Sequence, residues 1–196
     1  MIIWINGAFG SGKTHTAAEL HRRLKDSYLY DPEEIGYFIR RHVPEDAKED
    51  DFQDYALWRK FNYEMLSYNA TKYNGVIIAP MTLTSATYYD EIIGKLEGEG
   101  ICVHHYILDA DKDTLLKRLR SRLEGETSWA AQQIDRCLLA FSKEITQTKI
   151  NTVGKSIDEV VEEIANQSGL TLERDDRSGL RKRLDSLKVT IKHIRG

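Results

Sequence analysis

The sequence is poor in cysteine, in net charge and in long apolar runs. Its two cysteines, Cys102 and Cys137, lie in apolar surroundings without the spacing of metal ligands, so we expect buried free thiols in a reducing compartment. A formal net charge of −3 gives no overall attraction to nucleic acid, and no nucleic-acid partner is expected. No apolar run is long enough to span a membrane. The N-terminus is expected to form a strand rather than a signal peptide. We therefore expect a cytoplasmic, enzyme-sized chain.

What the sequence does contain is a complete G-x-x-x-x-G-K-[ST] motif from Gly7 to Thr14. An apolar run at 2–5 precedes it and helical spacing follows it, which is the strand, loop and helix context of a phosphate-binding loop. Glycines let successive N–H groups turn toward phosphates, and the helix N-terminus adds its dipole. Lys13 is expected to reach the β- and γ-phosphates, and the Thr14 hydroxyl to hold Mg²⁺. The predicted ATP- or GTP-binding residues are Gly7, Gly10, Ser11, Gly12, Lys13 and Thr14.

Strands and helices alternate along the rest of the chain. After the first strand, the spacing predicts strands at 27–30, 75–79, 102–108 and 148–152, and helices at 13–25, 32–43, 55–73, 86–99, 112–124, 127–141 and 157–167. This alternation predicts an α/β fold with a parallel five-stranded sheet and helices on both faces. We expect a P-loop domain at 1–170, with a lid at about 111–142, followed by a C-terminal tail at 171–196.

Asp31 is a candidate catalytic base. It follows the second predicted strand, at the edge where open α/β sheets bind ligands. A carboxylate there can accept the proton of a hydroxyl that attacks the γ-phosphate. The alternative is a turn aspartate that caps the next helix. The strand at 76–80 ends without the aspartate that many P-loop enzymes use to hold Mg²⁺, so catalysis is less strongly indicated than nucleotide binding.

The predicted lid is rich in basic residues, which kinases use to neutralise phosphoryl charge. Arg118 and Arg122 are four residues apart and share a helix face, so we take both as candidate catalytic residues. The alternative is a solvated basic surface. The basic residues of this region are Lys117, Arg118, Arg120, Arg122 and Arg136.

Aromatic residues are concentrated between positions 52 and 73. Such a stripe is typical of a core, but in this position it could also line an acceptor pocket, where rings stack on a base or sugar. The candidate substrate-binding residues are Tyr37, Arg40, Tyr55, Trp58, Arg59 and Asn62.

The tail combines an apolar stripe with many basic residues. Leu180, Leu184, Leu187, Ile191 and Ile194 recur at intervals of three and four. A basic amphipathic helix over 177–196 favours binding to an anionic membrane surface, which would place the protein at the inner face. The alternatives are docking on the protein's own domain or on a partner helix.

Several longer segments carry a family resemblance. They are Met1–Leu24, Asp31-Pro32-Glu33, Asp51-Phe52-Gln53, Leu57-Trp58-Arg59, Ile92-Ile93-Gly94, Val103-His104-His105, Thr114–Arg120, Ser128–Cys137 and His193-Ile194-Arg195. Through them the chain resembles the bacterial tunicamycin-resistance protein family. The resemblance implies a fold like that of nucleoside, shikimate and chloramphenicol kinases. It also implies an ATP-binding protein that protects cells from tunicamycin, a uridine-containing, fatty-acylated nucleoside antibiotic.

Two functions remain open from the sequence. One is an ATP- and Mg²⁺-dependent phosphotransferase that acts on the nucleoside antibiotic. The other is a nucleotide-dependent binder that sequesters the antibiotic without chemistry. The missing aspartate after the third strand favours the binder, and the arginine-rich lid favours the phosphotransferase.

Overall fold

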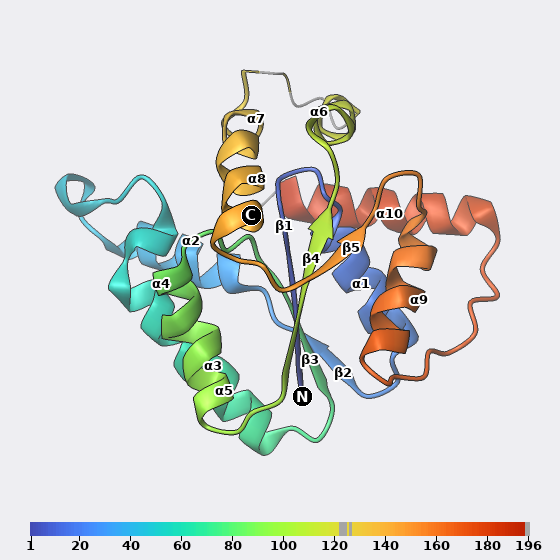
Figure 1. Cartoon of the computed structure of the whole chain (residues 1–196), viewed down its shortest axis with the longest axis horizontal. Coiled ribbons are helices and arrows are strands. Elements are labelled where there is room, and N and C mark those ends of the chain that lie inside the picture. The colour runs from blue at the N-terminus through green and yellow to red at the C-terminus, as the bar shows by residue number, and fades with distance from the viewer. Residues whose placement is uncertain (122–124, 126, 195–196) are drawn as a thin grey trace.

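The computed structural model describes residues 1–121, 125 and 127–194, with side chains up to residue 190. Its centre is a parallel sheet of five strands in the order β2-β3-β1-β4-β5 (Figure 1). The strands are β1 (Ile2–Gly7), β2 (Ser27–Leu29), β3 (Val76–Pro80), β4 (Val103–Asp109) and β5 (Thr148–Asn151). The predicted parallel five-stranded α/β fold is confirmed.

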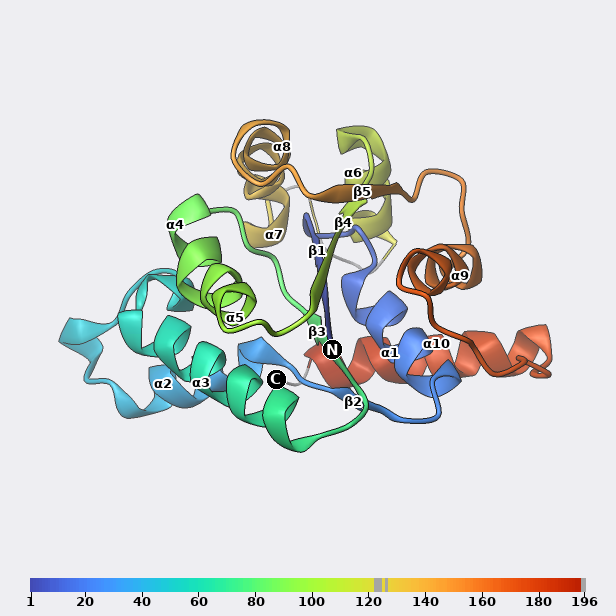
Figure 2. The ribbon, with the colours of Figure 1, turned by 60° about the horizontal axis from the view of Figure 1, so that its bottom comes forward.

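Helices pack on both faces of this sheet (Figures 1 and 2). Those before β4 are α1 (Lys13–Arg23), α2 (Pro32–His42), α3 (Ala56–Lys72), α4 (Ala86–Tyr89), η3 (Asp90–Gly94) and α5 (Lys95–Gly98), with short turns η1 (Glu45–Ala47) and η2 (Phe52–Asp54). Those after β4 are α6 (Lys112–Arg120), α7 (Trp129–Gln132), α8 (Ile134–Lys143), α9 (Ile157–Gln167) and α10 (Gly179–Ile194).

The central strand β1 explains the apolar run at the start of the sequence. Every residue of β1 is buried, because β3 and β4 pair with its two edges and helices cover both of its faces. Ile2 and Trp4 pack in one core with α2, α3 and η3, whereas Ile3 and Ile5 pack in another with α1 and α9. A strand buried on both faces is apolar throughout rather than alternating.

Some boundaries differ from the sequence prediction. The helix predicted at 86–99 contains a wider turn, η3, and the helix predicted at 127–141 is divided into α7 and α8. Ser128 caps α7, where its side chain accepts a hydrogen bond from the Ala131 N–H. The expectation of two buried thiols was half wrong, because Cys102 is exposed whereas Cys137 is buried.

The C-terminal helix α10 packs against α1 and crosses it (Figures 1 and 2). An ion-pair network holds it there: Arg177 Nη2 lies 2.7 Å from Glu19 Oε2, and Lys182 Nζ lies 2.6 Å from Asp158 Oδ2 and 2.8 Å from Asp175 Oδ2. Arg177, Glu19 and Asp175 are largely buried in this network, with 15%, 12% and 6% of their side chains exposed. Shielding from solvent makes such pairs stronger than ordinary surface pairs.

The charged face of α10 therefore docks on the domain, and the leucine stripe faces outward. Leu180, Leu184 and Leu187 are 74%, 60% and 55% exposed. The predicted Ile191 and Ile194 of the same stripe have side chains outside the described residues. Among the described residues, no helix is both long and apolar enough to cross a membrane. The tail thus docks on its own domain, as one of the sequence alternatives held, but it does so through charge rather than through its apolar stripe.

Candidate functional site

The glycine-rich loop after β1 forms a tight cradle. Gly7, Gly10 and Gly12 have φ values of 146°, 82° and 101°, which side-chain-bearing residues rarely adopt. A Cβ on Gly10 would lie 2.9 Å from the carbonyl oxygen of Leu115. Gly12 is the N-cap residue of α1, so the loop leads directly into the helix N-terminus. The backbone is thus shaped as phosphate binding by a loop and helix requires.

Polar side chains of this loop suit a phosphate group. The Lys13 ammonium donates hydrogen bonds to the carbonyl oxygens of Gly7 (2.9 Å) and Ala8 (3.2 Å), which holds it across the loop. The Ser11 hydroxyl is buried and has no hydrogen-bond partner among the described residues. Thr14 lies in the first turn of α1, half-buried. The cradle, the ammonium and the unpartnered hydroxyl together fit a nucleoside triphosphate, and the Thr14 hydroxyl fits its Mg²⁺.

Two cavities meet at the loop, since Gly10 and Gly12 line both. The first, which we call the Asp31 cavity, has a volume of about 320 Å³. It is lined by Phe9, Gly10, Gly12, Lys13, Thr14, Asp31, Glu33, Tyr37, Asp51, Phe52, Gln53, Pro80, Met81, Thr82, Leu119, Trp129 and Ala130. The second, the Thr152 cavity, has a volume of about 480 Å³. It is lined by Gly10, Ser11, Gly12, His15, Thr16, Arg118, Ser121, Thr152, Lys155, Ser156, Ile157, Val160, Ser186, Leu187 and Thr190.

Asp31 fits both interpretations made from the sequence. Its Oδ1 accepts a 3.0 Å hydrogen bond from the backbone N–H of Glu33 and so caps α2. The same residue lines the Asp31 cavity together with Lys13 and Thr14. Capping fixes the carboxylate at the end of β2, beside the phosphate loop. A cap and a catalytic base are therefore compatible at this position.

The carboxyl groups of the Asp31 cavity influence its tyrosine. The Tyr37 hydroxyl donates a 3.3 Å hydrogen bond to Glu33 Oε2. Burial, followed by the nearby Glu33 carboxylate, raises the pKa of Tyr37 to about 12. Tyr37 therefore stays a neutral hydrogen-bonding group at the wall of the cavity.

Three other candidate substrate residues brace the loop beside this cavity rather than line it. Arg40 donates to the carbonyl oxygens of Glu49 (3.1 Å) and Asp50, and the Tyr55 hydroxyl accepts a 2.8 Å hydrogen bond from the Glu49 N–H. Arg59 donates to the Gln53 carbonyl and pairs with Glu91, both at 2.6 Å. These contacts fix the segment 49–54, from which Asp51, Phe52 and Gln53 reach the cavity.

The prediction that Trp58 and Asn62 bind substrate is wrong in this structure. Both are fully buried between α2 and the sheet. The Trp58 indole N–H donates to the carbonyl oxygen of Pro32 (2.9 Å), and Asn62 hydrogen-bonds to Tyr30 and to the Trp58 carbonyl. The face of α3 that carries Trp58, Asn62 and Leu66 is thus core, whereas Phe61 and Tyr68 of the same helix are exposed.

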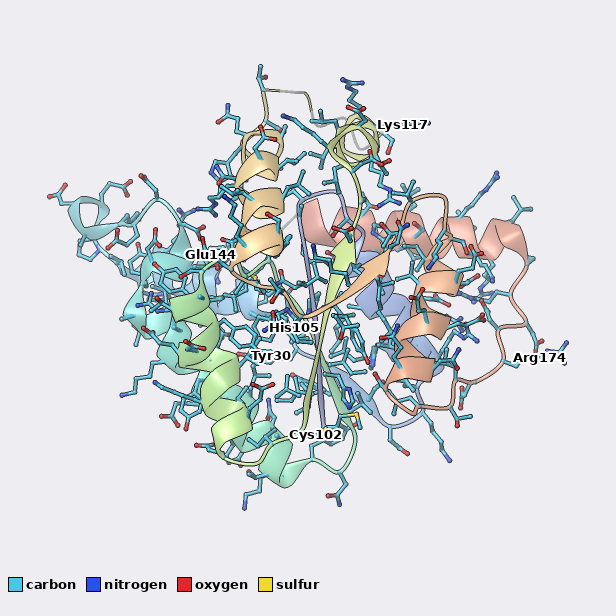
Figure 3. The ribbon with its side chains drawn as sticks, viewed as in Figure 1. Tyr30, Cys102, His105, Lys117, Glu144 and Arg174 are labelled. Carbon is cyan, nitrogen blue, oxygen red and sulfur yellow. The ribbon has the colours of Figure 1, made fainter. Side chains whose placement is uncertain are left out.

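The lid arginines Arg118 and Arg136 lie in different surroundings. Arg118 lines the Thr152 cavity, where its guanidinium donates to the Thr152 carbonyl (2.7 Å) and hydroxyl (3.0 Å) and to the Ser11 carbonyl (3.4 Å). Arg136 is outside the lining of both cavities and pairs with a residue of the Asp31 cavity, its Nη2 3.3 Å from Asp51 Oδ2. Lys117 points outward from α6 (Figure 3), and Arg122 lies outside the described residues.

Sequence reasoning missed several residues of the Asp31 cavity. Phe9 and Trp129 pack edge to face with ring centroids 5.0 Å apart, which joins the phosphate loop to the lid helix α7. Asp51 and Thr82 also line this cavity. Phe9 lies within the motif and could have been noticed. Trp129 is recruited only by the packing of the lid, which leaves no local signal.

This chain is similar to known proteins in sequence and in fold. The model of the family described as AAA domain matches residues 2–143. The structure of the tunicamycin resistance protein of Deinococcus radiodurans has 33% sequence identity to this chain, covers 89% of it and 99% of that protein, and superposes with a TM-score of 0.74. No curated protein sequence matches the chain.

More distant structures share the fold. A sugar kinase from Janibacter sp. HTCC2649 is 16% identical, covers 87% of this chain and 95% of that one, and has a TM-score of 0.63. The shikimate kinase from Aquifex aeolicus vf5 is 21% identical, covers 86% and 96%, and has a TM-score of 0.56. At these identities the similarity concerns the fold alone, which is that of small P-loop kinases.

Proposed function

Because this chain belongs to the AAA domain family and to the family of tunicamycin-resistance proteins, we propose that it transfers a phosphoryl group from ATP to a nucleoside antibiotic of the tunicamycin class. The observation that carries this proposal is the position of Asp31, which lines one cavity with Lys13 and Thr14 of the phosphate loop. A candidate base, a candidate phosphate ligand and a candidate Mg²⁺ ligand thus face the same space. This is the arrangement that in-line phosphoryl transfer needs.

In the proposed reaction, an acceptor hydroxyl oxygen forms a bond to the γ-phosphorus. The bond from that phosphorus to the β–γ bridging oxygen breaks, ADP leaves, and Asp31 takes the hydroxyl proton. Lys13 and the loop N–H groups neutralise charge on the phosphates. Mg²⁺, when bound through the Thr14 hydroxyl, would further neutralise the phosphate oxygens.

The two cavities divide the substrates between them. The Asp31 cavity holds the acceptor, because the candidate base lies there. The Thr152 cavity holds the base and sugar of ATP, because it lies on the other side of the loop and contains His15 and Thr16, the next residues along α1 after Thr14. Arg118 presents a planar guanidinium in this second cavity, a group suited to stacking on a base.

The test is the mass of the antibiotic after incubation with the protein and MgATP. The proposal expects tunicamycin to gain the mass of one phosphate and expects one ADP to be formed per product. Lys13→Ala protein serves as the inactive control. Unchanged antibiotic, with ATP bound by the parent protein, would rule out the phosphotransferase.

That outcome would favour the second function, a nucleotide-dependent binder that sequesters the drug. The observation that supports it is the end of β3. The strand ends at Pro80, Met81 and Thr82 follow it, and the Thr82 hydroxyl donates a 2.9 Å hydrogen bond to the Gly7 carbonyl. Many P-loop enzymes have a metal-binding carboxylate after this strand. In this chain the strand is followed instead by a hydroxyl that stabilises the phosphate loop.

We also propose that α10 brings the protein to the inner face of an anionic membrane. Its exposed leucines form an apolar stripe, and Arg181, Arg183 and Lys188 are exposed on the same helix. Basic residues around an apolar stripe complement anionic headgroups over acyl chains. A membrane surface is also where a fatty-acylated nucleoside antibiotic would be concentrated.

A further inference from the structure

The helix α10 borders the Thr152 cavity as well as carrying the leucine stripe. This cavity is lined by the phosphate loop with the start of α1, by Arg118 and Ser121 of the lid, by the segment that leads into α9, and by α10 itself. From α10, the residues Ser186, Leu187 and Thr190 reach the cavity. A segment about 175 residues away from the phosphate loop in sequence thus completes the cavity beside it.

A direct contact joins α10 to the first turn of α1. The Nε2 atom of His15 lies 3.1 Å from Thr190 Oγ1 and 3.3 Å from the Ser186 carbonyl oxygen. His15 follows Thr14 in the chain, so this contact begins one residue after the motif. A shift of α10 would therefore change the contacts of His15, at the edge of the phosphate loop.

The ion pairs anchor α10 on the two helices that start at the cavity. Arg177 pairs with Glu19 of α1 at 2.7 Å, and Lys182 pairs with Asp158 of α9 at 2.6 Å. The helix α1 begins at the phosphate loop, and α9 begins after Ser156, which lines the same cavity. The network thus sets the position of α10 relative to the phosphate-loop side and the α9 side of the cavity.

We propose that α10 is part of the nucleotide-binding site, so that nucleotide binding and docking of α10 stabilise each other. This inference rests on the proposed function, in which the Thr152 cavity takes the base and sugar of ATP. With α10 docked, Ser186 and Thr190 offer polar groups to the nucleoside, and Leu187 shields it from water. A ligand that contacts only the docked state shifts the equilibrium toward docking, and by linkage docking raises its affinity by the same factor.

The outward leucine stripe makes this arrangement compatible with membrane binding. Docking uses the charged face of α10, while Leu180 and Leu184 stay exposed. The helix can therefore contact a membrane without leaving the nucleotide site.

The first test measures docking in the unaltered full chain. Hydrogen–deuterium exchange of the α10 amides is followed by mass spectrometry with and without saturating MgATP. We expect MgATP to slow exchange in α10 about fivefold or more, the lower range of typical couplings. The Lys13→Ala protein, which should not bind ATP, should show no such change. Unchanged exchange in α10 of the parent, while the phosphate loop becomes protected, would overturn the inference.

The second test weakens docking and measures nucleotide affinity by calorimetry. In the full chain, Arg177→Glu with Lys182→Glu turns the ion pairs of these two residues with Glu19, Asp158, Asp175 and Asp185 into repulsions. We expect this double variant to bind MgATP at least about fivefold more weakly. The control, Arg181→Glu with Arg183→Glu, makes the same change in net charge at exposed positions of the same helix, and should bind MgATP as the parent does.

The outcomes separate this inference from the proposed function. If the parent binds no ATP, both the proposed function and this inference are wrong. If the parent and the Arg177/Lys182 variant bind MgATP equally, and exchange shows α10 released in that variant, α10 is no part of the site although the protein binds nucleotide. If both double variants lose affinity equally, net charge rather than docking is responsible, which also overturns the inference.

Discussion

The buried hydroxyl of Tyr30 donates a 2.7 Å hydrogen bond to Oδ1 of Asn62, and so joins the end of β2 to the middle of α3. Asn62 is fully buried and its amide nitrogen donates to the Trp58 carbonyl. Each polar atom of the Asn62 side chain thus has a partner within the protein. The pair fixes α3 against the sheet beside Asp31.

We expect Tyr30→Phe to lower the free energy of unfolding by about 1–3 kcal/mol, because it leaves the buried Asn62 oxygen without a donor. Tyr28→Phe, on the same strand but 51% exposed, is the matched control and should change stability by less than about 0.5 kcal/mol. Urea denaturation measures both. The KM for the antibiotic should stay unchanged in either variant. A large rise in KM for Tyr30→Phe alone would indicate that Tyr30 and Asn62 belong to the substrate site.

Replacing Lys13 with alanine should abolish ATP binding and leave the fold intact. The ammonium spans the loop carbonyls of Gly7 and Ala8, and we expect it to turn to the phosphates when they bind. MgATP should raise the melting temperature of the parent by mass action, but not that of the variant. Lys117→Ala, an exposed change on α6, should behave as the parent. Equal ATP affinity in the parent and the Lys13 variant would contradict the proposed phosphate site.

Asp31→Asn separates the two roles of this residue. Asparagine caps a helix about as well as aspartate does, so α2 and the overall stability should persist. Loss of a general base should lower turnover by about 10² to 10⁴, with ATP affinity little changed. Glu34→Gln, an exposed change on α2, is the control. Phosphorylation of tunicamycin at the parental rate by the Asp31 variant would exclude Asp31 as the base.

The buried His105 should make the protein less stable in mild acid. It lies on β4 in the interior (Figure 3), stacked on Tyr89, and neither ring nitrogen has a hydrogen-bond partner among the described residues. Burial lowers the pKa of His105 to about 3 from its usual 6.5. Below the unfolded value, the unfolded chain binds a proton that the folded chain does not. Stability is therefore full above about pH 6.5 and falls as the pH decreases toward 3.

Between pH 7.5 and 5.5, His105 should cost about 1 kcal/mol of the free energy of unfolding. His105→Phe should remove that part of the pH dependence, whereas His42→Gln, at an exposed position, should not. Chemical denaturation of the three proteins at both pH values gives the comparison. If the free energy of unfolding changes equally with pH in the parent and in His105→Phe, His105 does not cause this pH dependence.

The leucine stripe of α10 should govern vesicle binding. Replacing Leu180 and Leu184 with serine removes most of the exposed apolar contact but leaves the ion pairs of Arg177 and Lys182 and the cavity residue Leu187. We expect this double variant to lose most of its co-sedimentation with anionic vesicles while its ATP affinity and melting temperature stay parental. High salt should weaken the binding of the parent, because screening reduces the attraction of the basic residues. If the parent does not co-sediment with anionic vesicles at low salt, the membrane proposal is wrong.

Much of the fold follows from local sequence patterns. The Gly7–Thr14 motif, the apolar run of β1 and the alternation of strands and helices predicted the sheet and its helices, and α9 begins and ends where it was predicted. Caps such as Asp31 and Ser128 are also local, because each acts on N–H groups two or three residues away. These features depend on neighbours in the chain, so the sequence alone determines them.

The faces of the helices and the partners of long side chains depend on tertiary packing. The stripe containing Trp58 and Asn62 is typical of a core but left a substrate pocket open, and the packing of α3 against the sheet decides that this face is core. The stripe of α10 was equally ambiguous. Contacts across more than 150 residues, such as Arg177 with Glu19, turned its charged face inward. Sequence spacing shows which residues share a helix face, but only the packed fold decides what that face meets.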